Sequence, residues 1–249
     1  MALPIENTPV STPVVPMRRT YWGLLFKWVG LVTLFWLVEV LYSYYFVQER
    51  SYSDALVLGS AFAGATFFSL SLLLSVLFKF WPRLAVRWRI RRYLGVAAFV
   101  ALAMHGIWVW WYLFGGSVSG LFFSWNPISN PILLGMVAMP ILLAMAATST
   151  DWAVRKLGSR AWKTLHRFVY VAYAVGVLHF LFQNPPSLWN LAGYVLLVVT
   201  GCAIVGQLYL WIRYSSKRKF MNAGFWVGLC LVMFFSWLFI QLYRLYNAD

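Results

Sequence analysis

The chain has 249 residues, of which 62% are hydrophobic and 20% aromatic, and its mean hydropathy is +0.74. Only 10% of its residues are charged, against about 25% in soluble domains, and 20 Lys and Arg outnumber 6 Asp and Glu for a net charge of +14. This composition excludes an ordinary soluble enzyme, a disordered chain, a secreted disulfide scaffold and a nucleic-acid-binding domain, and it indicates a polytopic membrane protein.

A membrane-spanning helix needs about 20 mainly apolar residues. Seven stretches meet this condition: 21–47, 55–78, 93–114, 131–148, 165–182, 188–212 and 222–243. The expected fold is therefore an all-α membrane protein, a polytopic bundle of about seven transmembrane helices. We expect a flexible cytoplasmic tail over residues 1–20, a helical bundle over 21–212, and a basic loop with an additional C-terminal helix over 213–249.

The basic residues predict the orientation of this bundle. Eighteen of the 20 fall at the N-terminus and in the loops after the second, fourth and sixth spans: Arg18, Arg19, Lys27, Lys79, Arg83, Arg87, Arg89, Arg91, Arg92, Arg155, Lys156, Arg160, Lys163, Arg167, Arg213, Lys217, Arg218 and Lys219. Only Arg50 and Arg244 lie on the other side. Because loops rich in Lys and Arg stay in the cytoplasm, we expect the N-terminus inside and the C-terminus outside.

The chain has three histidines, and all of them fall in or at the edge of predicted spans. Ionisable residues at membrane depth are costly and tend to be functional, although a histidine can also serve as an interhelical hydrogen-bonding residue. At 1.5 Å per residue, His105 lies about 20 Å from the cytoplasmic edge, His179 about 24 Å and His166 only about 4–5 Å. Two imidazoles can hold one haem iron, so His105 and His179 could face one haem whose iron His166 does not reach.

The number of histidines also predicts the number of haems. A second haem at His166 would need another axial ligand near the cytoplasmic face, and no fourth histidine exists, so one haem is expected and two is the alternative. The 13 residues between His166 and His179 would turn an ideal helix so that they lie about 140° apart. Either the helix is distorted, for example near Gly176, or the two histidines serve different faces.

Other residues have two interpretations each. Four cations are expected at the cytoplasmic mouth beside His166: Arg91, Arg92, Lys163 and Arg167. In one interpretation they neutralise haem propionates or a flavin phosphate. In the other they only set the topology of the chain in the membrane. Glu39 is the one acid well inside a span. It is either a proton acceptor for quinol oxidation or a residue that bonds to a neighbouring helix or snorkels outward. Gly95, Gly106 and Gly176 either let a flat macrocycle approach the backbone or lie at helix-packing seams.

Several of these residues form motifs that resemble a known family. The run RRYLG at 91–95, followed by His105 in an aromatic-rich helix, resembles the third helix of ferric-reductase-like transmembrane domains. The runs TST at 148–150, KLG at 156–158 and WKTLHRFVY at 162–170, followed by His179, are similar to the haem-binding membrane subunit of the bacterial methionine-sulfoxide reductase system, the MsrQ type. The resemblance covers residues 85–183.

The resemblance implies a fold and a function. It implies a six-helix ferric-reductase-like core within residues 21–212, embedded in the lipid of a bacterial inner membrane. Such a protein takes electrons from a cytoplasmic flavin reductase, with FMN as a cofactor, or from membrane quinol, and passes them through haem to a periplasmic reductase catalytic subunit. His105, His166 and His179 match the three histidines of the family, whereas Arg91 stands where the oxidase branch has a further inner histidine.

Two other function classes remain open. A ferric-chelate reductase would share the haem and need no protein acceptor. A haem-free transporter or assembly subunit would use the histidines for packing or proton movement, but the mid-span Pro140 has no counterpart in a second repeat, which disfavours a transporter.

Overall fold

The computed structural model describes residues 18–47, 51–183 and 190–215. Its regular elements are helices: α1 (Arg18–Phe46), α2 (Tyr52–Phe80), α3 (Trp88–Trp108), α4 (Ile132–Ala147), α5 (Asp151–Arg167), α6 (Val169–Gln183) and α7 (Leu191–Ser215), with the short helical segments η1 (Pro82–Arg87), η2 (Val109–Leu113) and η3 (Ser119–Phe122). No strand occurs in these ranges, so the prediction of an all-helical fold is confirmed for the described residues.

Five stretches are long and apolar enough to cross a membrane: Phe26–Phe46, Tyr52–Phe80, Arg89–Leu113, Asp151–Gln183 and Leu191–Arg213. Helix α4 is also apolar but has only 16 residues. The chain is therefore a multi-pass membrane protein. The first six predicted spans all correspond to these helices, and the predicted seventh, over 222–243, lies outside the described residues.

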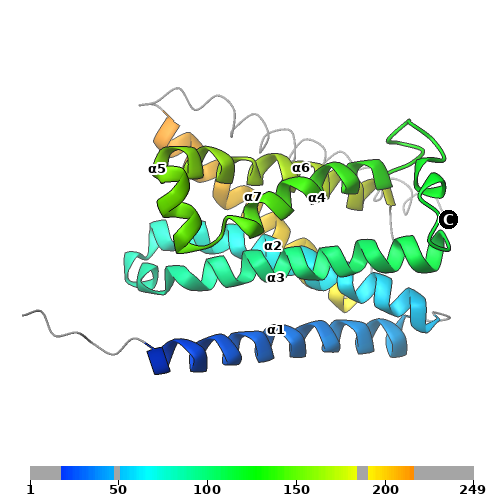
Figure 1. Cartoon of the computed structure of the whole chain (residues 1–249), viewed down its shortest axis with the longest axis horizontal. Helices are drawn as coiled ribbons and strands as arrows, with labels where there is room; N and C mark the ends of the chain where they lie inside the picture. The colour runs from blue at the N-terminus through cyan, green and yellow to red at the C-terminus, as the bar shows by residue number, and fades with distance from the viewer. Residues whose placement is uncertain (1–17, 48–50, 184–189, 216–249) are drawn as a thin grey trace, which may run out of the picture.

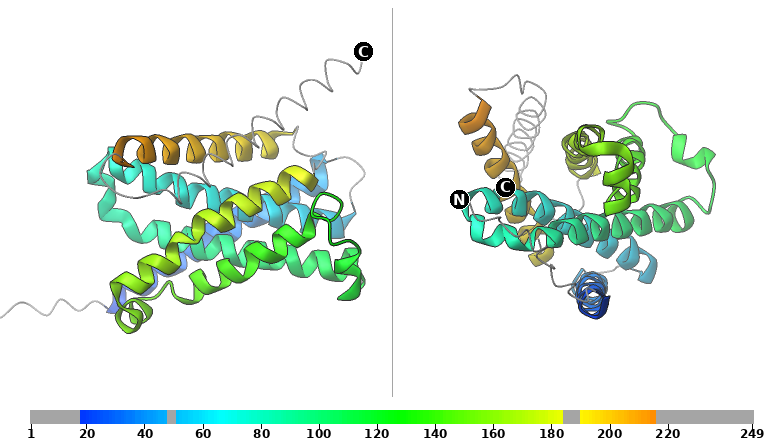
Figure 2. Two further views of the ribbon diagram at one scale, coloured as in Figure 1. Left: turned by 90° about the horizontal axis from the view of Figure 1, so that it is seen from above. Right: turned by 60° about the vertical axis from the view of Figure 1, so that its left-hand side comes forward.

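Helix α2 is the centre of the bundle. It packs against α1, α3 and α7, while α4 packs against α6. In Figure 1 the α2–α3 pair forms a middle layer with α1 on one side and α4, α5 and α6 on the other, and the right-hand view of Figure 2 keeps this order. Helices far apart in the sequence, such as α3 and α6, thereby lie in neighbouring layers of the bundle.

Close helix contacts use glycine where a side chain would not fit. A Cβ on Gly59 would lie 2.6 Å from the Cα of Val40, so α1 and α2 approach each other at backbone distance. A Cβ on Gly206 of α7 would lie 2.8 Å from the side chain of Val76 on α2. Membrane helices associate through such close packing because lipid supplies little hydrophobic drive between them.

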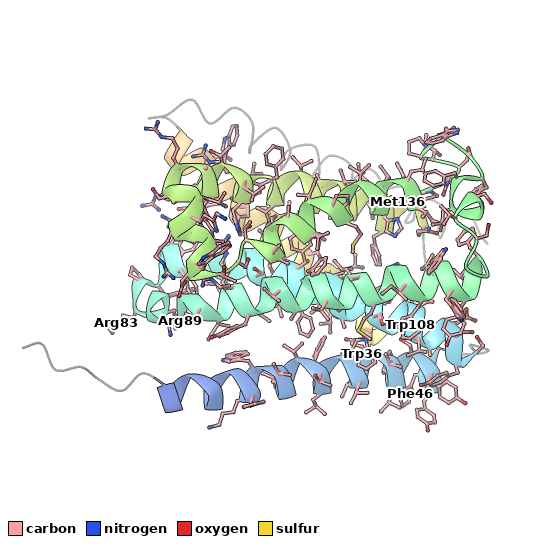
Figure 3. The ribbon with its side chains drawn as sticks, in the orientation of Figure 1. Trp36, Phe46, Arg83, Arg89, Trp108 and Met136 are labelled. Carbon is pink, nitrogen blue, oxygen red and sulfur yellow. The ribbon has the colours of Figure 1, made fainter. Side chains whose placement is uncertain are left out.

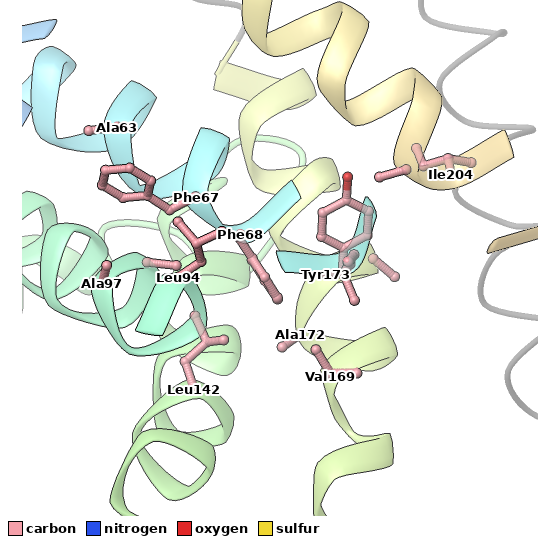
Figure 4. Close-up of a cluster of buried hydrophobic side chains, with 14 residues drawn as sticks. Ala63, Phe67, Phe68, Leu94, Ala97, Leu142, Val169, Ala172, Tyr173 and Ile204 are labelled. Atoms are coloured by element: carbon pink, nitrogen blue, oxygen red, sulfur yellow. The ribbon is translucent and has the colours of Figure 1, made fainter. Parts of the chain in front are cut away.

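The buried core lies where α2, α3, α4, α6 and α7 meet. Figure 4 shows its apolar members: Ala63, Phe67, Phe68, Leu94, Ala97, Leu142, Val169, Ala172, Tyr173 and Ile204. Polar bonds join the same helices, since Ser69 of α2 contacts the Tyr173 hydroxyl at 3.1 Å and the Thr200 hydroxyl of α7 at 3.0 Å. The core thus holds α6 against α2 at Tyr173, about one and a half helical turns before His179.

The predicted span over 165–182 is interrupted near its start. Phe168 donates its N–H to Leu165 at 3.1 Å, a tight turn that separates α5 from α6. Our expectation of a distortion near Gly176 is wrong in its position, because Gly176 lies inside the regular helix α6 and the break is at Phe168. Helix α5 is itself kinked at Gly158, whose φ of 75° suits a residue without a Cβ.

The two ends of the bundle differ in composition. Figure 3 labels Arg83 and Arg89 at one end and Phe46, Trp108 and Met136 toward the other. The first of these, which also carries α5, is called the basic end from here on.

Candidate functional site

The imidazole rings of His105 and His179 lie next to each other between α3 and α6. Their ring centroids are 6.3 Å apart and their planes are inclined by 66°. His105 is on α3 in the middle layer, and His179 is on α6 in the layer formed by α4, α5 and α6. The fold thus brings together two residues that are 74 positions apart. The sequence placed them at similar depths, and the structure brings the rings side by side.

Both rings are held through the same nitrogen. The Nδ1 of His105 lies 2.9 Å from the carbonyl oxygen of Val57 on α2, and the Nδ1 of His179 lies 2.8 Å from the carbonyl oxygen of Pro131 at the start of α4. A carbonyl only accepts hydrogen bonds, so each Nδ1 carries the hydrogen and each Nε2 keeps its lone pair. This is the tautomer of a metal-binding histidine anchored by a backbone carbonyl.

The spacing of the two rings fits one shared iron. Imidazole–metal bonds are about 2 Å long, which puts two ring centroids on one ion roughly 6 Å apart once the ring radii are added. Gly135 of α4 leaves room beside His179, because a Cβ there would lie 3.5 Å from the ring atoms Nδ1 and Cε1. A Cβ on Gly176, one turn before His179, would meet nothing within 4 Å.

The donor set also fits a macrocycle better than a bare ion. No group of three or more His, Cys, Asp or Glu able to hold a metal occurs in the described part of the chain. Two imidazoles alone are too few ligands for a structural zinc site, which uses four protein ligands. A haem iron needs only axial ligands from the protein, so the residues present fit a haem.

His166 belongs to a different site at the basic end. Its ring stacks on Trp162 with centroids 4.0 Å apart, and its Nε2 lies 3.2 Å from the Thr148 hydroxyl. That hydroxyl donates its own hydrogen to Ala144 at 2.7 Å, so it accepts from His166. His166 therefore carries its hydrogen on Nε2, the opposite tautomer from that of His105.

The four predicted cations have different surroundings. Arg92 forms an ion pair with Asp151 at 2.6 Å, which joins α3 to the start of α5. Arg91 interacts electrostatically with both His166 and Tyr170. Lys163 and Arg167 are exposed on α5. The structure thus brings both Arg91 and Arg92 within electrostatic reach of His166, and Arg92 is in addition paired with Asp151.

Glu39 lies in the second half of α1. It is only 8% exposed, and its Oε2 has no hydrogen-bond partner among the described residues. One turn earlier, Trp36 donates its indole N–H to Ser60 of α2 at 2.9 Å. Because Val40 lies against Gly59 and the two helices are antiparallel, Glu39 lies near the turn of α2 that contains Ser60. Both interpretations of Glu39 therefore stay predictions.

Some contributors to the site carry little sequence signal. The carbonyls of Val57 and Pro131 could not be identified, because a backbone acceptor is the same in every residue. Gly135 was not singled out either. By contrast, Thr148 and Trp162 stand within the TST and WKTLHRFVY runs, so the signal for their contacts with His166 was present in the motifs.

Comparison with known proteins supports the resemblance drawn from these motifs. Residues 60–177 match the family described as the ferric reductase like transmembrane component. This stretch contains His105 and His166 and ends two residues before His179. No solved structure matches the chain.

Similar proteins include several named protein-methionine-sulfoxide reductase heme-binding subunit MsrQ. The one from Bordetella pertussis is 44% identical over 143 residues, which is 52% of this chain and 63% of that protein. The one from Agrobacterium fabrum is 38% identical over 52% of this chain and 60% of that protein, and the one from Caulobacter vibrioides is 33% identical over 55% and 60%. The matches thus span about three fifths of these relatives, and the predicted resemblance is confirmed.

Proposed function

We propose that this chain is a membrane-embedded electron carrier that holds one haem b between His105 and His179. The observation that carries the proposal is the pairing of the two rings, 6.3 Å apart, with each Nδ1–H anchored on a carbonyl and each Nε2 available to iron. The similarity to proteins named as heme-binding subunits supports the same assignment.

When bound, a haem supplies a one-electron couple at its iron. The chain's own residues set the conditions for that couple. The carbonyls of Val57 and Pro131 orient the imidazoles and make them more basic ligands. The surrounding apolar helices exclude water, which lowers the local dielectric constant and so influences the potential.

A single haem agrees best with the state of His166. Its Nε2–H is donated to Thr148, and the chain has no histidine beyond the three. A second haem at this end would need His166 to change partners and to find a ligand of another type. We therefore assign His166 to the electron-entry side, as a residue that positions the donor.

The basic end supports entry of electrons from the cytoplasm. His166 stacks on Trp162, Arg91 lies beside them, and Lys163 and Arg167 extend the positive charge along α5. Cations of this kind attract the phosphate of a flavin such as FMN, so a cytoplasmic flavin reductase is one donor that fits. Membrane quinol is the other, because the same helices face lipid.

The proposed topology follows the distribution of basic residues. With 18 of 20 Lys and Arg on one side, the N-terminus lies in the cytoplasm of a bacterial inner membrane, and seven spans including 222–243 put the C-terminus outside. Electrons then leave at the end opposite the basic end. The names of the relatives support a periplasmic methionine-sulfoxide reductase catalytic subunit as the acceptor.

A second acceptor is favoured by the description of the matching family. The similarity of residues 60–177 to the ferric reductase like transmembrane component supports direct reduction of a ferric chelate, without a protein partner. The haem, its histidines and the donor side would be the same in both cases. Only the oxidant would differ.

Reconstitution in vesicles tests the proposal. The full chain is purified with haem, inserted in lipid vesicles and reduced either by NADH with a flavin reductase or by a quinol, while the absorption of the haem is recorded. We expect reduction by one of these donors and reoxidation by a periplasmic methionine-sulfoxide reductase that is supplied with methionine sulfoxide as the final electron acceptor. Reoxidation by ferric citrate alone would favour the second candidate, and a purified protein without haem absorption would contradict both.

A further inference from the structure

The loop between α3 and α4, residues 114–131, contains a polar side chain that is completely buried. Asn130 is 0% exposed and is among the largest side chains hidden in this way in the described part of the chain. The loop lies at the end of the bundle opposite the basic end, as Figure 1 shows. An amide carries two hydrogens to donate and an oxygen that accepts, and its burial is costly unless these groups are bonded. The position of Asn130 therefore needs a structural reason.

Both amide hydrogens of Asn130 hold the loop. Its Nδ2 donates to the carbonyl oxygen of Leu121 at 2.9 Å and to that of Ser124 at 3.0 Å. Its backbone N–H donates to the carbonyl of Asn126 at 2.8 Å, and its own carbonyl accepts from the N–H of Leu133 at 3.3 Å, in the first turn of α4. Four hydrogen bonds thus join the loop to the start of α4 at this one residue.

The residue after Asn130 is the one that holds His179. The carbonyl of Pro131 accepts from the Nδ1 of His179 at 2.8 Å and from the N–H of Leu134 at 3.0 Å. The proline ring fixes the φ of Pro131, which is −62°, and the peptide that follows belongs to α4. The position of this carbonyl therefore depends on where the chain enters α4, and the bonds of Asn130 set that entry.

The same loop also contacts the end of the segment that carries His105. Phe114 directly follows η2, the continuation of α3, and its ring stacks on Phe123 with centroids 6.5 Å apart and planes inclined by 16°. Phe123 lies between the two residues whose carbonyls accept from the Asn130 amide. The bonds of Asn130 thus lie between the continuation of the His105 helix and the carbonyl that anchors His179.

The remaining polar atom of Asn130 makes no contribution to this arrangement. Its Oδ1 is buried and has no hydrogen-bond partner among the described residues. An unsatisfied buried acceptor is unfavourable, so an apolar residue of similar size would be better here if packing alone mattered. The two donors of the amide, and hence the two carbonyls that they hold, explain an asparagine at this position.

We propose that Asn130 is a positioning residue for the haem ligand His179. By holding the loop to the start of α4, it fixes the carbonyl of Pro131 and, through that carbonyl, the plane of the His179 imidazole. This role rests on the proposed function, since it concerns a ligand of the haem that His105 and His179 share. Asn130 acts through Pro131, as an outer partner of a metal-binding histidine.

Electron paramagnetic resonance and haem transfer of the full-length holoprotein test this role. The largest g-value of a low-spin haem with two imidazoles depends on the angle between the ring planes, and transfer of haem to an excess of apomyoglobin measures how firmly the protein holds it. The test variants are Asn130→Leu, which keeps about the same volume without the donors, and Asn130→Ala. The matched control is Asn126→Ala, which removes from the same loop an exposed amide whose Oδ1 accepts from the N–H of Ile128. Both measurements are made per haem, so a lower yield of protein does not affect them.

We expect both Asn130 variants to show a shifted g-value and to lose haem about tenfold faster than the wild type, as for other outer partners that orient a metal-binding histidine. The control should match the wild type in both measurements. A wild-type g-value and transfer rate in Asn130→Leu would overturn the role of Asn130, even if Asn130→Ala differs, because only packing would then matter. An equal change in the control would overturn it as well. The proposed function would stand in both of these cases, whereas a wild type without haem would contradict the proposed function itself.

Discussion

The imidazole rings of His105 and His179 lie side by side, and each is held through its Nδ1 by a backbone carbonyl oxygen. Val57 holds one ring from α2 and Pro131 holds the other from the start of α4, at 2.9 and 2.8 Å. With a centroid separation of 6.3 Å, the rings leave room between them for a single metal ion. Four helices thus contribute to one site, although only two of them supply side chains.

Enlarging Gly135 should displace one of these rings. In Gly135→Leu the new side chain would start 3.5 Å from the Nδ1 and Cε1 atoms of His179 and would need the space that the ring occupies. We expect this variant to lose most of its haem, measured as haem per chain after purification. Gly135→Ala is the control, since a Cβ at 3.5 Å is an ordinary contact, and it should keep its haem. Equal haem content in both variants would refute the role given to this position.

Removing the hydroxyl that fixes His166 should affect the donor side alone. In Thr148→Val the acceptor of the Nε2–H is lost, and we expect the rate of reduction by the physiological-type donor to fall about tenfold, as for other groups that orient a functional histidine. Haem content and reduction by dithionite should not change. The matched control is Ser149→Ala, whose hydroxyl donates to the carbonyl of Met145 in the last turn of α4. A loss of haem in Thr148→Val would instead indicate a second haem at His166.

The sequence was sufficient for the parts of this protein that depend on pattern. Apolar length located the helices, and the count of residues from the basic clusters put His105 and His179 at one depth and His166 at another. These inferences work because a membrane fixes the length and direction of each span. The resemblance to ferric-reductase-like proteins could also be predicted, because it depends on the order and spacing of motif residues along the chain.

The parts that could not be predicted depend on local backbone geometry. The break at Phe168 is a single tight turn in a run of helix-forming residues, and no proline marks it. Its position lets the rings of His166 and His179 lie in different surroundings without a distortion at Gly176. The sequence carries no signal for the hydrogen bonds to the carbonyls of Val57 and Pro131 either, because they form only when α2, α3, α4 and α6 are packed together.

The glycine contact between α1 and α2 should be important for stability. A Cβ on Gly59 would lie 2.6 Å from a backbone atom of Val40, so the helices would have to move apart in Gly59→Ala. We expect a loss of about 1–3 kcal/mol, typical of overpacking, measured by thermal unfolding in detergent. The control is Gly30→Ala on α1, where a Cβ meets nothing within 4 Å and helix propensity favours the change. Equal stability of the two variants would contradict this packing.

Glu39 should cost stability in the folded protein. Its buried Oε2 has no hydrogen-bond partner among the described residues, and an unsatisfied buried polar group costs about 1–3 kcal/mol. Glu39→Leu is therefore expected to raise the unfolding temperature, whereas Glu39→Gln keeps a polar group there and should change it less. If Glu39→Leu unfolds at a lower temperature than the wild type, the carboxyl has a stabilising partner and this interpretation is wrong.

Low-temperature electron paramagnetic resonance of the oxidised protein, combined with haem quantification, tests the axial ligands most directly. The account predicts one haem per chain with the low-spin signal of two imidazole ligands. That signal should disappear in His105→Ala and in His179→Ala and remain in His166→Ala. A bis-imidazole signal that survives the loss of either His105 or His179, or that disappears with His166, would contradict the account.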